Sequence, residues 1–132
     1  TWKEATEWRA QFKETIEDLT SRWKCFDPTL HFNDDPYCNI MYGDRLEYAA
    51  MNMDLHKLRN ADVVIMDLNH PNSIGTAVEL GVAIENRIPI IAFCDQDKRS
   101  NIHPWQEIAP LMICDCIEDA MTVFIDQFIN LD

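Results

Sequence analysis

The chain has 132 residues, of which 47% are hydrophobic, and a formal net charge of −12 at pH 7. This length suits one domain with one core. The strong negative charge argues against a nucleic-acid backbone or an anionic membrane as a partner, and no apolar run is long enough to cross a bilayer. No signal peptide is visible. Because the chain begins at Thr1 rather than at a methionine, the sequence does not exclude further residues before Thr1.

The cysteines and histidines form no metal site or disulfide framework that the sequence can identify. The pair Cys114 and Cys116 lacks the two-residue spacer of a zinc site, and Asp95-Gln96-Asp97 begins like a calcium loop but has Ser100 where a glycine is needed. Reduced thiols in a cytoplasmic protein are the simplest account of the odd number of cysteines. We expect no metal and no cofactor. The five cysteines are Cys25, Cys38, Cys94, Cys114 and Cys116, and the four histidines are His31, His56, His70 and His103.

Hydrophobic periodicity predicts helices and strands that alternate along most of the chain. Two amphipathic helices are expected first, with apolar positions at Ala5, Trp8, Phe12, Ile16, Leu19 and Trp23, and at Leu46, Ala49, Ala50, Met53, Leu55 and Leu58. In chain order the expected elements are a helix over 2–23, a short strand at 25–26, a loop over the site at 33–43, a helix over 44–60, a strand over 61–68, a helix over 76–86, a strand over 88–93, a polar loop over 95–107 with a short turn at Pro104, a strand over 111–114 and a helix over 117–129.

This alternation predicts right-handed crossovers and therefore a parallel sheet flanked by helices. The expected fold is α/β, of the Rossmann or flavodoxin-like kind, as one domain over residues 1–132. No repeat, low-complexity tract or linker interrupts it.

The most informative stretch runs from the strand-like segment 61–68 into the sequence Ser73-Ile74-Gly75-Thr76-Ala77-Val78-Glu79-Leu80-Gly81. It predicts a strand, a short polar loop and a helix that starts at 73–76. Ligands bind beyond the carboxyl ends of parallel strands, where helix N-termini favour negative charge. Glu79, a carboxylate in an apolar segment, is therefore expected to stay ionised and able to attack carbon. The alternative is a first-turn glutamate that the helix dipole merely favours.

Four features in order carry a family resemblance: Asp54-Leu55, the strand opening Asn60-Ala61-Asp62, the run from Gly75 to Ala83, and the strand Ile88 to Phe93. Together they resemble the nucleoside 2-deoxyribosyltransferase family. That family includes transferases that exchange bases on deoxyribonucleosides and hydrolases that act on 2′-deoxynucleoside 5′-phosphates. The resemblance implies cleavage of an N-glycosidic bond through a covalent glycosyl-Glu79 intermediate, by base transfer or by hydrolysis.

The resemblance also implies roles for other residues. Asp54 takes the place of the family aspartate near the reacting sugar and base; the alternative is a solvated helix residue. Family members open with a strand that carries a glycine-rich turn and often an active-site tyrosine. This chain begins at the helix expected after that strand, so either a fragment or an unusual domain is expected. The tyrosines of this chain are not at the family position, and none takes that role: Tyr37, Tyr42 and Tyr48.

Ser73 bears on the choice of substrate. In the family's nucleoside transferases this neighbourhood tends to carry an acidic residue, whereas in its 5′-phosphate hydrolases it carries a serine. The Ser73 hydroxyl with the N–H groups of Gly75 and Thr76 would make an anion site at the helix end. The alternative is that Ser73 is only the N-cap of the helix.

Two further expectations concern partners. The helix over 76–86 is apolar nearly all round, and the family it resembles forms dimers and larger rings, so a homo-oligomer is expected. The expected ligand is a nucleoside or nucleotide, with no nucleic acid or membrane as partner. A non-catalytic domain that binds or senses a nucleotide remains the alternative, since the same strand, loop and helix could hold a phosphate without cleaving anything.

Overall fold

The computed structural model describes residues 2–28 and 46–130, and it divides into two compact units, Thr1–Lys57 and Leu58–Asp132. The first unit contains helix α1 (Trp2–Leu19) and most of helix α3 (Leu46–Arg59). The second contains the sheet, with its strands β1 (Val64–Asp67), β2 (Ile90–Phe93) and β3 (Met112–Cys114). The expected loop at 33–43 lies outside the described residues.

Helix α1 follows the predicted periodicity over most of its length. Phe12 and Ile16 are buried, whereas Leu19 of the same apolar stripe is 54% exposed. The helix also ends at Leu19 rather than at Trp23. The chain turns directly after it, because the backbone N–H of Arg22 donates to Thr20 Oγ1 at 3.2 Å.

The predicted strand at Cys25 and Phe26 is wrong, since the structure has no strand within residues 20–28. Side chains of α1 satisfy the backbone of this segment instead. The Cys25 N–H donates to the Glu17 carboxylate at 2.8 Å, and the Cys25 carbonyl accepts from Lys13 Nζ at 2.8 Å. The segment therefore has hydrogen-bond partners without joining a sheet.

Helix α3 confirms the helix predicted over 44–60. Ala50 is buried, whereas Met53 is 40% exposed. Leu55 and Leu58 are half-buried.

The sheet of the second unit is parallel and has the order β1-β2-β3, which confirms the predicted α/β class. Val64 pairs with Ile90 and Met66 with Ala92, and Ala92 pairs with Ile113. Side chains alternate between the two faces of a strand, so these residues share one face. That face holds the core cluster, which consists of Met66, Leu68, Leu80, Ala83, Ile88, Ile90, Ala92, Cys94 and Ile102.

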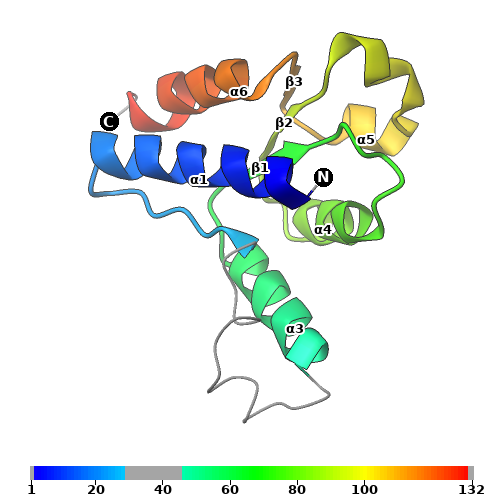
Figure 1. Cartoon of the computed structure of the whole chain (residues 1–132), viewed down its shortest axis with the longest axis horizontal. Helices are drawn as coiled ribbons and strands as arrows, with labels where there is room; N and C mark the ends of the chain where they lie inside the picture. The colour runs from blue at the N-terminus through cyan, green and yellow to red at the C-terminus, as the bar shows by residue number, and fades with distance from the viewer. Residues whose placement is uncertain (1, 29–45, 131–132) are drawn as a thin grey trace. The chain divides into compact units, whose positions relative to one another are not determined.

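Helices cover both faces of this sheet. Helix α4 (Ile74–Glu85) packs on β1 and places Leu80 and Ala83 in the core cluster. Helix α6 (Ile117–Phe124) packs on β2 and β3, and continues as a π-helical turn over Ile125–Ile129. Figure 1 shows α4 and α6 on different sides of the strands. The layering expected from alternating strands and helices is thus present.

The segment predicted as a polar loop over 95–107 contains two short helices; the second begins at Pro104, where a short turn was predicted, whereas the first was not predicted. They are the 3₁₀ helix η4 (Gln96–Asn101) and the α-helix α5 (Pro104–Ile108). A capping box starts α5: His103 Nδ1 accepts from the Trp105 N–H, and the Gln106 side chain accepts from the His103 N–H. With Pro104 at the first turn, these contacts make a short helix favourable.

Helix α4 ends in a tight turn before β2. Arg87 has a φ of 55°, the left-handed backbone region. Its N–H donates to the Ile84 carbonyl at 3.1 Å, and the Ile88 N–H donates to the Ala83 carbonyl at 2.9 Å. These bonds satisfy the last carbonyl groups of the helix and return the chain to the sheet.

Candidate active site

The candidate site begins where β1 ends and the chain turns into α4. The Ser73 N–H donates to the His70 carbonyl at 3.0 Å, which closes a turn in the loop 69–73. Ser73 is the N-cap of α4: its Oγ accepts from the Thr76 N–H at 3.3 Å and from the Thr76 hydroxyl at 3.2 Å. The capping role of Ser73 is therefore present in the structure. It leaves the hydroxyl proton of Ser73 for another acceptor.

The open N–H groups at this helix end belong to Ile74 and Gly75. The Thr76 N–H is used by Ser73 Oγ, and the Ala77 N–H donates to the Ser73 carbonyl at 3.1 Å. Within the described residues, no group accepts from the N–H of Ile74 or Gly75, as is usual for the first turn of a helix. The donors that face outward are thus Ser73, Ile74 and Gly75, while Thr76 orients Ser73.

Gly75 keeps the space in front of these donors open. It is exposed, and a Cβ built on it would have Ser73 Oγ, at 4.0 Å, as its nearest neighbour. Packing within the chain therefore does not require a glycine at this position. A ligand that approaches the backbone closely would require one.

Glu79 lies farther along α4 than the sequence suggested. The helix begins at Ile74, so Glu79 is its sixth residue, and the first turn contains no acidic residue. The helix dipole acts mainly on the first turn. The interpretation of Glu79 as a first-turn glutamate is therefore wrong. Glu79 is half-buried, and because it lies three residues after Thr76 the two side chains are neighbours on the helix surface.

Ser73, Gly75, Thr76 and Glu79 are thus brought together at one end of α4. Asp54 lies on α3 in the first unit, where it is half-buried while His56 and Lys57 are exposed. This burial differs from the solvated helix position that was the alternative for Asp54.

Three polar residues around the loop 69–73 were not predicted as functional. Asp67 Oδ1 accepts from the backbone and the side-chain amide of Asn69, at 2.9 and 2.8 Å. Asn69 Oδ1 in turn accepts from the Asp95 N–H at 2.8 Å. Gln106 is buried and reaches the Pro71 carbonyl. The Asp-x-Asn spacing after a strand is a turn signal that could have indicated Asn69, but no local signal connects Gln106 with Pro71.

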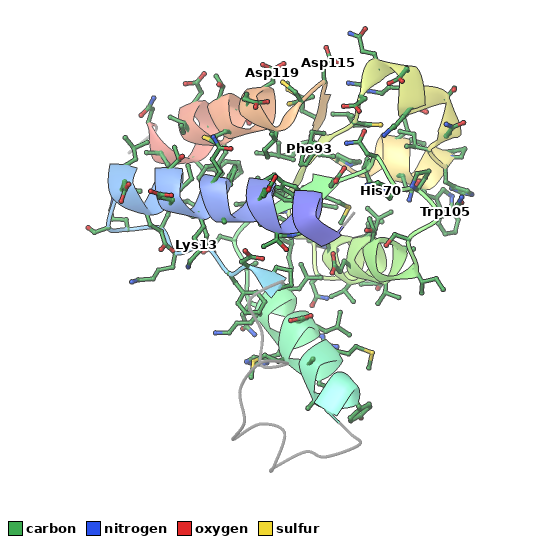
Figure 2. All side chains as sticks on the ribbon, in the orientation of Figure 1. Lys13, His70, Phe93, Trp105, Asp115 and Asp119 are labelled. Atoms are coloured by element: carbon green, nitrogen blue, oxygen red, sulfur yellow. The ribbon has the colours of Figure 1, made fainter. Side chains whose placement is uncertain are left out.

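An ion pair between Arg99 and Asp115 joins η4 to the carboxyl end of β3. Arg99 of η4 donates to the Ile113 carbonyl and to the Asp115 carboxylate, both at 2.9 Å. Gln96 donates to the second Asp115 oxygen at 3.0 Å. Asp115 therefore fixes η4 against the end of β3. Figure 2 shows Asp115 at this edge of the second unit.

The described cysteines, Cys25, Cys94, Cys114 and Cys116, carry free thiols, and Cys38 lies outside the described residues. Burial raises the pKa of the Cys94 and Cys114 thiols above the usual value. Burial and the nearby Glu17 raise the pKa of Cys25 to about 11. These thiols are therefore protonated and poor nucleophiles at neutral pH.

Over residues 2–28 and 46–130, no three His, Cys, Asp or Glu side chains are grouped so that they could hold a metal ion. In the same ranges no helix has the length and apolar character that spanning a membrane requires.

The sequence model of the family described as nucleoside 2-deoxyribosyltransferase matches residues 2–126. No curated protein and no solved structure matches the chain. The matched range includes β1, α4 and the residues of the candidate site.

Proposed function

Because the chain belongs to the nucleoside 2-deoxyribosyltransferase family, we propose that it cleaves the N-glycosidic bond of 2′-deoxynucleosides or of their 5′-monophosphates. Membership implies an enzyme of glycosyl transfer or hydrolysis that binds nucleosides. The observation that carries the finer proposal is the placement of Glu79, half-buried on α4, beside Thr76 and the capped helix end. The match spans both units, which supports one functional domain over residues 1–132.

In the proposed reaction a Glu79 carboxylate oxygen forms a bond to the anomeric carbon of the sugar. The bond from that carbon to the base nitrogen breaks, and its electron pair leaves with the base, which takes up a proton. Water or a second base then attacks the same carbon and releases Glu79 as a carboxylate. Two displacements leave the configuration retained. The carboxylate also stabilises the positive charge that develops on the sugar.

Asp54 is proposed to lie near the reacting sugar and base and to assist the departure of the base. The family match and the Asp54-Leu55 pair support this role, as does the half-burial of the side chain. Asp54→Asn should lower kcat by at least about tenfold, within the range of general acid catalysis. Asp62→Asn is the matched control, since Asp62 is exposed. Equal losses in both variants would remove Asp54 from the mechanism.

The preferred substrate is proposed to carry a 5′-phosphate, bound by the Ser73 hydroxyl and the N–H groups at the start of α4. Outward-facing donors at Ser73, Ile74 and Gly75 and the open space at Gly75 support this. The net charge of −12 opposes an anionic ligand, but a local site can overcome it. Ser73→Asp would place like charge against the phosphate and should reverse or erase the preference.

The test is a panel of deoxynucleosides and deoxynucleoside monophosphates, each incubated with and without a second base and followed by chromatography. Release of free base, with kcat/KM for monophosphates at least about tenfold above that for nucleosides, is expected; this ratio corresponds to about 1.4 kcal/mol. Product with a new base would assign transfer, and free sugar phosphate would assign hydrolysis. Equal rates on both classes would favour a nucleoside transferase. Binding without any release of base would favour the non-catalytic alternative.

A homo-oligomer is the proposed assembly, with the outward side of α4 at an interface. Ile74 is 82% exposed, and Val78 and Ile84 are 45% exposed each, along one helix. Light scattering at micromolar concentration should give at least twice the chain mass, and Val78→Lys should lower it. Lys98→Ala, on an exposed ion pair of η4, is the control. A monomer that keeps full activity would contradict the proposal.

The reduced, partly buried thiols support a cytoplasmic location, which cell fractionation would test.

A further inference from the structure

Asn69 joins the carboxyl ends of two strands through its side chain. The last backbone bond between β1 and β2 runs from the Leu68 N–H to the Phe93 carbonyl at 2.9 Å. One residue later the Asn69 amide takes over: its nitrogen donates to Asp67 Oδ1 at 2.8 Å, and its oxygen accepts from the Asp95 N–H at 2.8 Å. This bridge needs a donor and an acceptor in one short side chain. Among the residue types of similar size, asparagine supplies both.

Gln106 holds the same loop at a second point. It is 4% exposed, although its neighbour Trp105 is 72% exposed. Its oxygen accepts from the His103 N–H at 2.8 Å, and its nitrogen donates to the Pro71 carbonyl at 3.4 Å. A buried side-chain amide requires partners for both groups.

The capping box alone does not explain a glutamine at this position. The box uses only the oxygen of the side chain, and glutamate serves equally well in that role. The nitrogen of Gln106 instead reaches a residue of the loop before α4, 35 positions earlier in the chain. A glutamate would direct a carboxylate at the Pro71 carbonyl, and two acceptors would face each other.

These two side chains hold the loop 69–73 at Asn69 and at Pro71, in addition to the turn bond from the Ser73 N–H to the His70 carbonyl. His70 and Asn72 are exposed, so burial in the core does not hold this part of the loop. By contrast, α4 is anchored independently, since Leu80 and Ala83 lie in the core cluster. Displacement of the loop would move Ser73, its last residue, more than it would move Glu79 on α4.

We propose that Asn69 and Gln106 are positioning residues, which hold the loop 69–73 so that Ser73 and the start of α4 bind the 5′ end of the substrate. This inference rests on the proposed function for the identity of the substrate. It predicts a specific division of effects: loss of either contact weakens substrate binding and leaves the chemical step almost unchanged. A substitution that removes binding energy shared equally by the ground state and the transition state raises Kd and leaves kcat unchanged.

Gln106→Glu tests the second contact, because it keeps the size of the side chain and the capping oxygen but removes the donor to Pro71. Gln127→Glu is the matched control, since Gln127 is exposed and acquires the same charge. The Kd of a deoxynucleoside monophosphate, measured by calorimetry, should rise at least about fivefold in Gln106→Glu, the size of one neutral hydrogen bond. Its kcat should stay within about twofold of wild type, and the control should match wild type in both.

Asn69→Ala tests the first contact by a measurement that needs no substrate. Hydrogen exchange of the Asp95 N–H should become faster in Asn69→Ala, because its acceptor is removed, and should stay unchanged in Asn72→Ala. In the described part of the chain, the Asn72 side chain makes no hydrogen bond, so it controls for a change of residue type in the same loop. This arm also covers the case in which Gln106→Glu fails to fold.

Three results separate the possibilities. Unchanged Asp95 exchange in Asn69→Ala would overturn the bridge, and a lower kcat at unchanged Kd in Gln106→Glu would overturn the positioning role. If wild type binds the monophosphate but releases no base, the catalytic function fails while the rise in Kd still supports the inference.

Discussion

Ser73 Oγ lies 3.3 Å from the backbone nitrogen of Thr76 and 3.2 Å from the Thr76 hydroxyl oxygen, so one serine oxygen accepts from both groups of the same residue. This geometry makes Ser73 the N-cap of α4. It leaves the hydroxyl proton of Ser73 for another acceptor. Capping and binding are therefore two roles of one side chain, and they can be separated by experiment.

Ser73→Ala and Ser73→Gly separate them. Alanine at an N-cap costs about 1 kcal/mol of stability, whereas glycine costs only a few tenths. Both variants lose the hydroxyl. If the hydroxyl binds phosphate, the two variants should show similar losses of monophosphate affinity but different free energies of unfolding in urea. Affinity losses that follow the stability losses, and that are equal for nucleosides and monophosphates, would leave Ser73 as a cap alone.

Glu79→Ala should lower kcat by at least about three orders of magnitude, the scale seen when a covalent catalytic residue is removed. The fold should survive, because Glu79 is not among the residues of the core cluster. Glu85→Ala is the matched control, since Glu85 is exposed on the same helix. Circular dichroism and kcat are measured on all three proteins. Activity near the wild-type value in a folded Glu79→Ala protein would contradict the nucleophile assignment.

Gly75→Ala and Gly81→Ala form a second matched pair within α4. Neither new Cβ would meet an atom closer than 4.0 Å, so Gly81→Ala, inside the helix, should stabilise it by about 0.5–1 kcal/mol, and Gly75→Ala, in the first turn, should stabilise it less. Gly75→Ala should nevertheless bind a deoxynucleoside monophosphate more weakly, because the methyl group occupies the open approach to the outward N–H groups. Gly81→Ala should bind it as wild type does. Urea unfolding and calorimetry measure the two quantities, and equal affinities would place the ligand elsewhere.

Glu17 makes stability depend on pH at the acidic end. Hydrogen bonds from the Cys25 N–H and from Lys13 hold the pKa of Glu17 below its ordinary value of 4.5. Its contribution to stability is therefore present above pH 4.5 and is lost as the pH falls through the lower, folded-state pKa. Wild type should exceed Glu17→Gln in free energy of unfolding at pH 7, and the difference should shrink by pH 3. A difference that stays constant between these pH values would exclude the carboxylate as its cause.

The parts of the fold with strong periodicity could be predicted from the sequence. The order of β1, α4, β2, β3 and α6 follows from apolar runs that alternate with helical patterns. The predictions that were wrong concern segments where single side chains decide the structure. Cys25 looks like part of a strand because it lies in a short apolar run, but Glu17 and Lys13 satisfy its backbone. No periodicity reports a contact of this kind.

The helix start at the candidate site could be predicted from the sequence, whereas the contacts that hold the loop before it could not. The sequence placed Ser73, Gly75 and Thr76 at a helix start, and the structure puts α4 there. The helix start came two residues earlier than Thr76, and that shift alone moved Glu79 out of the first turn. The contact between Gln106 and Pro71 could not be predicted, because it joins residues 35 positions apart and depends on the packing of α5.

The left-handed backbone at Arg87, where α4 turns into β2, has an evolutionary consequence. A non-glycine residue in this region bears a conformational cost of about 1 kcal/mol, which is least for glycine and asparagine and greatest for β-branched side chains. The amino-acid types tolerated at position 87 are therefore restricted by the backbone conformation and not by catalysis. A change to valine or isoleucine would therefore lower the free energy of unfolding whether or not it affected the activity.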